Sequence, residues 1–273
     1  MSFRFVIEPG RSEKNYWQDI WRYRELFYIL AWRDIKVRYK QTALGVAWSI
    51  VRPLLTMIIF TIIFSKLAKL PAQGSAPYAV MVYAAMLPWQ FFSASLTEAS
   101  NSLVGNANLI TKVYFPRIII PTSSVFTSLV DFGIAFLLYL GMLAWFQYMP
   151  PLQILLLPVF ILLTFWCSFG ISLYLTAVNV KYRDFRYIIP FIVQFGLYVS
   201  PVGFSSSIVP QKWQWLYNLN PMVGIIDAFR WCLLRDSPFN WNSFLTCIII
   251  TLASCYFGIR YFRRTERSFA DNI

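Results

Sequence analysis

The sequence has no histidine, and only 13% of its residues are charged. Histidine is the commonest metal ligand and titrates near neutral pH, so its absence argues against zinc sites, Ser-His-Asp triads and histidine proton relays. The four cysteines form no C-x-x-C pair, and we expect them to fill apolar space rather than hold a metal. A soluble domain carries about 25% charged residues, so the low charge indicates a membrane protein.

The phosphate-binding pattern G-x-x-x-x-G-K-[ST] is also missing. If ATP drives this protein, the hydrolysing subunit must be another chain, and we expect neither enzymatic activity nor a cofactor on this one. The net charge of +12 would suggest nucleic acid on a soluble chain. In a membrane chain the same excess is typical of cytoplasmic loops, so we predict no nucleic-acid partner.

Six apolar stretches reach the length of about 20 residues that crosses the hydrocarbon core. They are residues 46–67, 78–103, 118–146, 152–178, 187–204 and 244–262. Of the 24 basic residues, those on the side opposite the N-terminus are only Lys66, Lys69, Lys212, Arg230 and Arg235. Because cytoplasmic loops carry the excess of Lys and Arg, both termini are predicted in the cytoplasm, and an even number of spans agrees. The predicted fold class is all-α and integral to the membrane.

One segment outside the spans, residues 24–40, has a helical pattern. At 100° per residue its apolar and aromatic stripe consists of Tyr28, Trp32, Ile35 and Tyr39. Three cations form the adjacent stripe: Arg33, Lys36 and Lys40. This pattern predicts a helix in the cytoplasmic interface, with rings in the acyl boundary and cations toward the headgroups of membrane lipids. A plain membrane anchor without a further role is the alternative.

A second segment, residues 205–241, is long for an exterior loop and unusually apolar. Its rings are Trp213, Trp215, Tyr217, Phe229, Trp231, Phe239 and Trp241. A fully solvated loop would not hold these side chains. We therefore predict short helices that fold back and insert partly at the outer face, because irregular backbone at that depth must lie against protein or a water-filled cavity.

Two carboxylates fall inside the predicted spans, Glu98 near the inner end of the second and Asp131 about midway along the third. Carboxylates in a membrane are expensive to desolvate and are functional candidates by default. Neither has a second deep carboxylate beside it, and the sequence offers no deep basic partner except Arg52. We therefore favour structural hydrogen bonding over proton coupling.

Four ordered blocks are more specific. They are RDIKVRYKQTALGVAWSIVRPLL at 33–55, SNSLVGNANLITKVYFPRIIIP at 100–121, NVKYRDFRYIIPF at 179–191 and LNPMVGIIDAFRW at 219–231. Together they resemble the permease subunits of polysaccharide ABC exporters, in the type-2 ABC transporter family, which export O-antigen, capsule or teichoic acid. The resemblance covers residue 23 to the C-terminus. We therefore divide the chain into a cytoplasmic segment, 1–23, and a transmembrane domain, 24–273.

The resemblance implies six spans per subunit, a homodimer in the bacterial inner membrane, and two separate ABC ATPase subunits that bind ATP and Mg. It also implies an interfacial helix, matched by residues 24–40, and re-entrant outer helices after the fifth span, matched by 205–235. A cytoplasmic gate is implied at Leu44 and Gly45, where glycine suits a sharp turn.

A short coupling helix is implied after the second span. Asn108 is a good N-cap and the chain reaches Pro116 soon after, so we expect this helix at 109–115. The residues expected to contact the ATPase are Asn108, Leu109, Ile110, Lys112, Tyr114 and Phe115.

The substrate expected from this resemblance is a lipid-linked polysaccharide, O-antigen first, carried from the cytoplasmic to the outer side. Cations attract phosphate, so the lipid pyrophosphate is expected to meet Arg33, Lys36, Lys40 and Arg52. Aromatic rings offer flat, tolerant contacts to the C–H faces of sugars. The predicted channel lining is Trp48, Tyr83, Phe91, Phe92, Phe195, Tyr198 and Phe204. The predicted outer gate is Trp213, Trp215, Asn220, Pro221, Phe229 and Arg230.

Other functions are weighed against this one. A membrane glycosyl- or acyltransferase needs a general base and usually a metal or nucleotide-sugar site, which the residue types oppose. A secondary transporter predicts inverted repeats with helices broken at the midplane, and we find none. Within the resemblance, capsular polysaccharide and teichoic acid are alternatives to O-antigen, because the motifs do not distinguish the polymer or its lipid.

Overall fold

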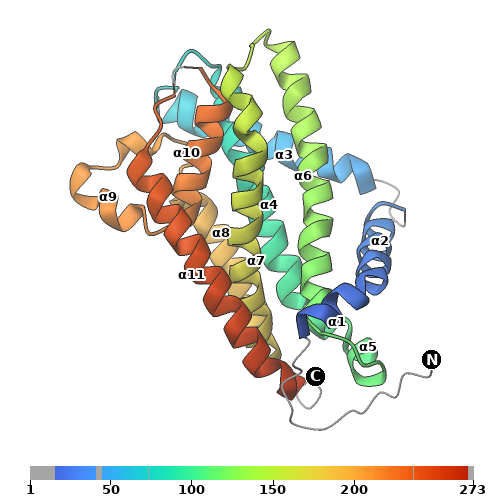
Figure 1. The fold of residues 1–273 in the computed structure, drawn as a ribbon. Helices are drawn as coiled ribbons and strands as arrows, with labels where there is room; N and C mark the ends of the chain where they lie inside the picture. Colours follow the sequence, from blue (N-terminus) through green and yellow to red (C-terminus); the bar gives the residue numbers. More distant parts are fainter. Residues whose placement is uncertain (1–15, 41–44, 73, 236, 270–273) are drawn as a thin grey trace.

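The computed structural model describes residues 16–40, 45–72, 74–235 and 237–269, and these ranges are helical without a strand. Five helices are long and apolar enough to cross a membrane, and they form one bundle (Figure 1). They are Ala47–Leu67, Tyr78–Gly105, Ile119–Trp145, Leu152–Lys181 and Trp241–Ser268. Each corresponds to one of the six predicted spans.

Short connections join most of the helices along the chain. On the N-terminal side lie α1 (Tyr16–Arg22), α2 (Arg24–Lys40), α3 (Gly45–Phe60) with the π-helical turn η1 (Thr61–Leu67), α4 (Tyr78–Gly105), α5 (Ala107–Lys112) and α6 (Ile119–Trp145). The remainder comprises η2 (Leu152–Leu156), α7 (Leu157–Lys181), α8 (Phe185–Val199), η3 (Ser206–Ile208), α9 (Gln211–Tyr217), α10 (Pro221–Leu233), α11 (Trp241–Thr265) and η4 (Glu266–Ser268).

The predicted span at 187–204 is not confirmed, because α8 is too short to cross. Its 15 residues rise about 1.5 Å each, well short of a hydrocarbon core of about 30 Å. The helix ends at Val199 because Ser200 takes an extended backbone, with ψ 152°, and the following Pro201 disfavours the helical conformation. Beyond it the chain passes through η3 into α9, which lies at the side of the bundle, and then into α10, which packs within the bundle against α4, α7 and α11 (Figure 1).

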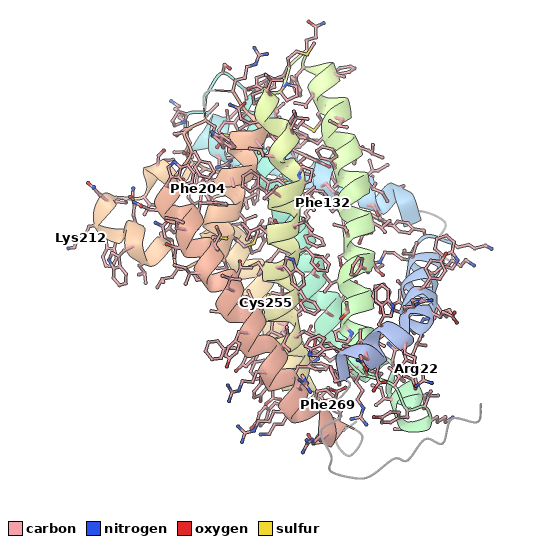
Figure 2. All side chains as sticks on the ribbon, in the orientation of Figure 1. Arg22, Phe132, Phe204, Lys212, Cys255 and Phe269 are labelled. Carbon is pink, nitrogen blue, oxygen red and sulfur yellow. The ribbon has the colours of Figure 1, made fainter. Side chains whose placement is uncertain are left out.

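Helix α4 is the centre of the fold. In its most apolar stretch 78% of the residues are buried, against 17% for the span formed by α3 and η1. Its side chains pack on α6, α7 and α10. Phe91, for example, contacts Phe132 of α6 edge to face at 6.0 Å between ring centroids, and Figure 2 shows Phe132 inside the bundle.

Helices α7 and α11 approach each other at two glycines. A Cβ on Gly258 would lie 2.1 Å from the carbonyl oxygen of Gly170, and a Cβ on Gly170 would lie 2.5 Å from the amide nitrogen of Cys255. Small residues let helix backbones pack this closely in membranes. The pair therefore fixes α11 against α7.

The first and last described elements meet at one end of the bundle (Figure 1). The Tyr16 hydroxyl donates to Glu266 at 2.9 Å, and the Arg263 guanidinium lies 4.5 Å from the centroid of the Tyr16 ring. The other carboxylate oxygen of Glu266 accepts from the Arg117 amide at 2.7 Å. Helix α1, the turn before α6, and α11 with η4 are therefore joined at the end that carries α2 and α5, which the basic residues predict to be cytoplasmic.

Candidate substrate path, coupling surface and outer pocket

Helix α2 has the bounds predicted from sequence, Arg24–Lys40. Glu25 in its first turn and Arg38 and Lys40 in its last complement the helix dipole. Leu30 is buried, and Phe27 packs edge to face on Phe126 of α6 at 5.1 Å between centroids. Of the predicted stripe, Tyr28 and Trp32 are exposed and stack on each other at 6.4 Å between centroids, whereas Ile35 and Tyr39 are half-buried. Its position in the membrane interface stays a prediction.

Arg38 is the basic partner of both carboxylates that the sequence left without one. Its guanidinium lies 2.8 Å from the Glu98 carboxylate of α4 and also contacts the Asp131 carboxylate of α6. The Tyr39 hydroxyl donates to the second oxygen of Asp131, and half-burial raises the pKa of Tyr39 to about 12. The expectation that only Arg52 could pair with these carboxylates is therefore wrong. Arg38 instead ties α2 to two spans at once.

A second contact joins α2 to the short helix α5. Arg33 donates to the Asn106 side-chain oxygen at 3.0 Å, while the Asn106 amide donates to the Ser102 carbonyl of α4 at 2.8 Å. Asn106 is also the N-cap residue of α5, which runs from Ala107 to Lys112. The predicted helix at 109–115 capped by Asn108 is thus placed two residues too late, because α5 follows α4 after the single residue Asn106.

The residues predicted to contact the ATPase differ in how far their side chains are buried. Ile110 and Phe115 are buried in a cluster with Leu30, and Leu109 is half-buried at its edge. Exposed side chains from the predicted set are Asn108, Lys112 and Tyr114. Helix α5 therefore has an anchored side and a free side, and only the free side can meet another protein.

The predicted phosphate-binding cations are exposed on two consecutive helices. Those on α2 are Arg33, Lys36 and Lys40, and Arg52 is exposed on α3. Lys36 lies 5.3 Å from the Trp32 ring, and Arg33 is held by Asp34 at 2.8 Å. Of the predicted gate, Gly45 is the first residue of α3 and Leu44 lies outside the described residues.

The predicted channel aromatics fall into two groups. Tyr83, Phe91 and Phe92 of α4 are buried in the core, where Tyr83 stacks on Tyr139 at 6.2 Å between centroids. Exposed fractions are 51% for Trp48, 60% for Phe195 and 59% for Tyr198. Phe204, half-buried, lies 6.4 Å from Phe64 between ring centroids.

Three exposed rings lie on one face of α8. The Tyr198 ring of α8 lies 6.1 Å from Phe60 of α3, and Phe191 stacks on Phe195 at the same centroid distance. Residues 191, 195 and 198 are spaced four and three apart, so they line one face of α8. Helix α8 thus presents an aromatic face, and Tyr198 on this face lies against the buried Phe60 of α3.

The predicted outer-gate residues lie in α9 and α10 but in different environments. Trp213 and Trp215 are exposed on α9. Asn220 caps α10 by accepting from the Met222 amide at 3.0 Å, and Pro221 is its first residue. Phe229 and Arg230 are fully buried.

Arg230 supports the turn that ends α8. Its guanidinium donates to the carbonyls of Phe204 at 2.7 Å and Val202 at 3.0 Å. Tyr78 donates to the carbonyl of Gly203, between those two residues. Burial lowers the pKa of Arg230 to about 10, although the charge of Asp227 acts to raise it. The guanidinium is therefore still a cation at neutral pH. A buried cation thus satisfies backbone oxygens that the short α8 leaves open.

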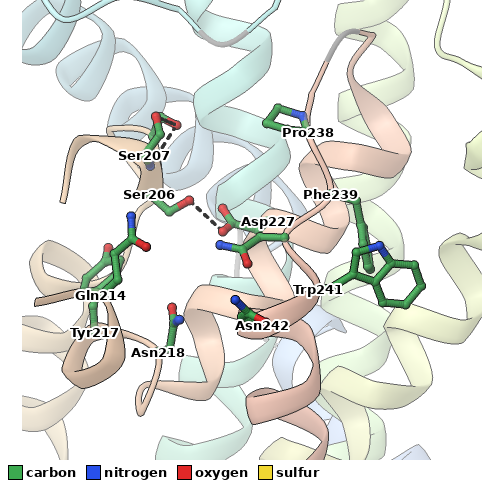
Figure 3. A pocket seen from close by; sticks show the side chains of 12 residues that line it. Ser206, Ser207, Gln214, Tyr217, Asn218, Asp227, Pro238, Phe239, Trp241 and Asn242 are labelled. Carbon is green, nitrogen blue, oxygen red and sulfur yellow. Dashed lines mark hydrogen bonds between the residues drawn. The ribbon is translucent and has the colours of Figure 1, made fainter. Parts of the chain in front are cut away.

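A polar cavity lies beside this turn (Figure 3). Its volume is about 330 Å³, and its walls come from residues 205–207, from α9, from Asp227 of α10 and from residues 238–242. Gln214, Tyr217 and Asn218 face Asp227 across it, and Phe239 and Trp241 stand at the far side (Figure 3). The predicted gate residues border this region, but the described side chains that line the cavity are others.

Asp227 is buried with one oxygen satisfied. Ser206 donates to it at 2.7 Å, while the second carboxylate oxygen and the Tyr217 hydroxyl have no hydrogen-bond partner within the described part of the chain. Burial raises the pKa of Asp227, although the hydrogen bond from Ser206 and the charge of Arg230 both act to lower it. Burial also raises the pKa of Tyr217. The sequence signal for this site was a single carboxylate within the apolar block at 219–231.

Comparison with known proteins supports a transport role for this arrangement. Residues 25–234 match the family described as ABC-2 type transporter. The chain is similar to the O-antigen export system permease protein RfbA of Klebsiella pneumoniae, with 28% identity over 90% of this chain and 94% of that protein. It is also similar to RfbA of Myxococcus xanthus (25%, 94% and 98%) and to the polysialic acid transport protein KpsM of Escherichia coli (21%, 86% and 92%).

Proposed function

Because the chain belongs to the ABC-2 type transporter family, we propose that it is the membrane subunit of an ATP-driven exporter of lipid-linked polysaccharide. The observation that carries the proposal is the likeness to O-antigen export permeases along nearly the whole of both chains. O-antigen is therefore the first candidate polymer. Capsular polysaccharide is the alternative, supported by the weaker likeness to a polysialic acid transport protein.

The proposed path for the glycan runs along the aromatic face of α8 and the neighbouring helix α3. Tyr83, Phe91 and Phe92 are core residues of one subunit, and a polymer would have to open that core to touch them. We therefore restrict the path to the exposed rings. Two copies that face each other through α3 and α8 would enclose these rings, and flat aromatic surfaces suit a polymer that must slide.

The proposed ATPase contact is the exposed side of α5. Asn106, at the start of α5, accepts a hydrogen bond from Arg33 of α2. Arg38, also on α2, forms ion pairs with α4 and α6. A push on α5 would therefore reach α2 and two spans through polar contacts. Coupling of this kind is a free energy that links two sites.

The proposed lipid-binding surface comprises Arg33, Lys36 and Lys40 on α2 and Arg52 on α3. The side chains of all four residues are exposed. Cations at a membrane interface attract the pyrophosphate of a polyprenyl-type carrier. The polymer would then leave this surface along the aromatic face.

The test is a deletion strain complemented with this chain. We expect the deletion to remove surface polysaccharide and leave lipid-linked polymer inside the cell, and the intact gene to restore export. The purified chain alone should not hydrolyse ATP, whereas the chain with its partner ATPase should. Normal surface glycan in the deletion strain, or ATP hydrolysis by the isolated chain, would contradict the proposal.

Orientation is tested separately. We propose that both termini are cytoplasmic in the bacterial inner membrane, since α1 and the end of α11 meet at the same end of the bundle. A single cysteine at residue 15, in a chain without its four native cysteines, should resist an impermeant thiol reagent in intact cells. A cysteine replacing Lys212 should be labelled.

A further inference from the structure

The cavity between α9, α10 and the start of α11 holds polar groups that the described residues leave unsatisfied. One oxygen of Asp227 and the hydroxyl of Tyr217 are buried without a hydrogen-bond partner there. Buried polar groups in folded proteins are paired with protein or ligand atoms or with ordered water, because an unpaired one is costly. An unpaired carboxylate oxygen and phenol on the wall of one cavity therefore point to an occupant.

We propose that this cavity binds one sugar ring of the exported glycan as it reaches the outer side. The inference rests on the proposed function for the identity of the polymer, but the site itself is built from the cavity and its side chains. A volume of about 330 Å³ lies at the small end of the roughly 300–1,000 Å³ typical of ligand pockets, so it fits a single pyranose rather than a stretch of chain.

The lining has the two kinds of surface that a pyranose needs. Amide side chains at 214, 218, 240 and 242 both donate and accept hydrogen bonds, and the free Asp227 oxygen accepts from a sugar hydroxyl. Phe239 and Trp241, 4.7 Å apart between centroids, offer ring surface to the C–H face. Among the described residues that line the cavity, Asp227 is the only carboxylate, which disfavours a metal cation.

Hydrogen bonds link the wall of this cavity to the chain segment that follows α8, at the end of the proposed path. Ser206 binds Asp227, and Arg230 one turn further along α10 holds the carbonyls of Val202 and Phe204. A sugar that binds Asp227 would therefore act on the segment that joins α8 to α9. We infer that the site senses a ring arriving along α8.

The experiment uses the complete exporter, with its ATPase, in lipid nanodiscs. Saturation-transfer NMR would measure the binding of methyl glycosides of galactose, mannose and N-acetylglucosamine. Cyclohexanol is the negative control, because it has a six-membered ring but lacks the hydroxyl pattern of a sugar. We expect at least one glycoside to bind, and cyclohexanol not to. Asp227→Asn and Trp241→Ala should each weaken that binding by about tenfold or more, as loss of a charge-assisted hydrogen bond or a stacking ring does.

Trp145→Ala is the matched control, because Trp145 at the end of α6 is 84% exposed and does not line the cavity, whereas Trp241 is 66% exposed and does. Binding in this control should stay within about twofold of the wild type, since no lining group is lost. Tyr217→Phe, which removes only the hydroxyl, keeps the test open if Asp227→Asn does not fold. Absence of glycoside binding to the folded wild type, or equal loss in both tryptophan variants, would overturn the site and leave the cavity to water.

Failure of the site and failure of the proposed function give different results. If deleting the chain abolishes surface polysaccharide but no glycoside binds, only the sugar site is wrong. If glycosides bind as expected but the deletion leaves export intact, the site stands and the polysaccharide exporter is wrong.

Discussion

Helices α4 and α8 carry the same kinds of side chain in opposite surroundings. Phe91 and Tyr83 of α4 lie in the core against α6 and α7, whereas Phe195 and Tyr198 of α8 are more than half exposed. Both helices are apolar and aromatic, so composition does not separate them. The difference is that α4 is surrounded by α6, α7 and α10, while α8 is short and lies at one side of the bundle.

This comparison teaches that an aromatic excess has two sources in a membrane protein. Some rings replace aliphatic side chains in the core, and others are left on a surface that lipid, a second copy or substrate must cover. Mutations at the two sets should therefore differ in what they damage.

The largest effect is expected for Phe91→Ala. Removing a buried ring leaves a cavity and costs about 3–5 kcal/mol, so we expect inserted protein, and with it export, to be nearly lost. Phe195→Ala is the matched control and should leave the protein level unchanged. A membrane-protein blot measures both, and equal levels of the two variants would break the comparison between α4 and α8.

The next effect is expected where α4 continues into α5. Leu109 is half-buried, so Leu109→Asp would disturb packing as well as docking, and the exposed Lys112 gives a cleaner test. A negative charge there should cut export by about a hundredfold at normal protein level, since reversing a charge in an interface disfavours the partner by several kcal/mol. Lys212→Glu, exposed on α9, is the control. An unaffected Lys112→Glu exporter would remove α5 from the proposed ATPase contact.

A smaller effect is expected on the exposed side. Phe195→Ala with Tyr198→Ala should slow export per inserted molecule by roughly fivefold to tenfold, because two stacking surfaces of about 0.5–0.7 kcal/mol each, the low end of the usual range, are lost without a packing defect. Surface glycan measured beside a protein blot gives the ratio. Unchanged export per molecule would remove α8 from the proposed path.

The smallest effect is expected for Tyr83→Phe. The Tyr83 hydroxyl is buried with no hydrogen-bond partner among the described residues, so its removal should leave stability within about 0.5 kcal/mol of the wild type. Thermal unfolding in detergent measures this. A clear loss of stability would mean that the hydroxyl has a partner, such as water, inside the core.

Sequence reasoning located most of the helices because their lengths and apolar patterns are local properties. It placed α2 correctly at Arg24–Lys40 and predicted five spans close to their observed positions. It overextended α8, since 187–204 is apolar throughout and only the backbone at Ser200 ends the helix. The membership of the ABC-2 type transporter family was also predicted, because it depends on ordered motifs.

The contacts between distant segments could not be predicted in this way. Arg38 is one of several cations on α2, and nothing in its own neighbourhood distinguishes it from Lys36 or Lys40. Its pairing with Glu98 and Asp131 depends on how α2 lies across α4 and α6. The outer cavity likewise gathers side chains from four separate segments between residues 205 and 242. Burial and pairing of this kind are decided by tertiary packing.

The contact between Gly170 and Gly258 has a consequence for how the chain is assembled. Gly170 is synthesised long before Gly258, with α8, α9 and α10 made in between. Until α11 arrives, the glycine surface of α7 can be covered only by lipid or by another chain. Assembly in the membrane therefore closes late, when α11 docks on α7, and a nascent chain released before residue 258 would present an unfilled groove to the quality-control machinery.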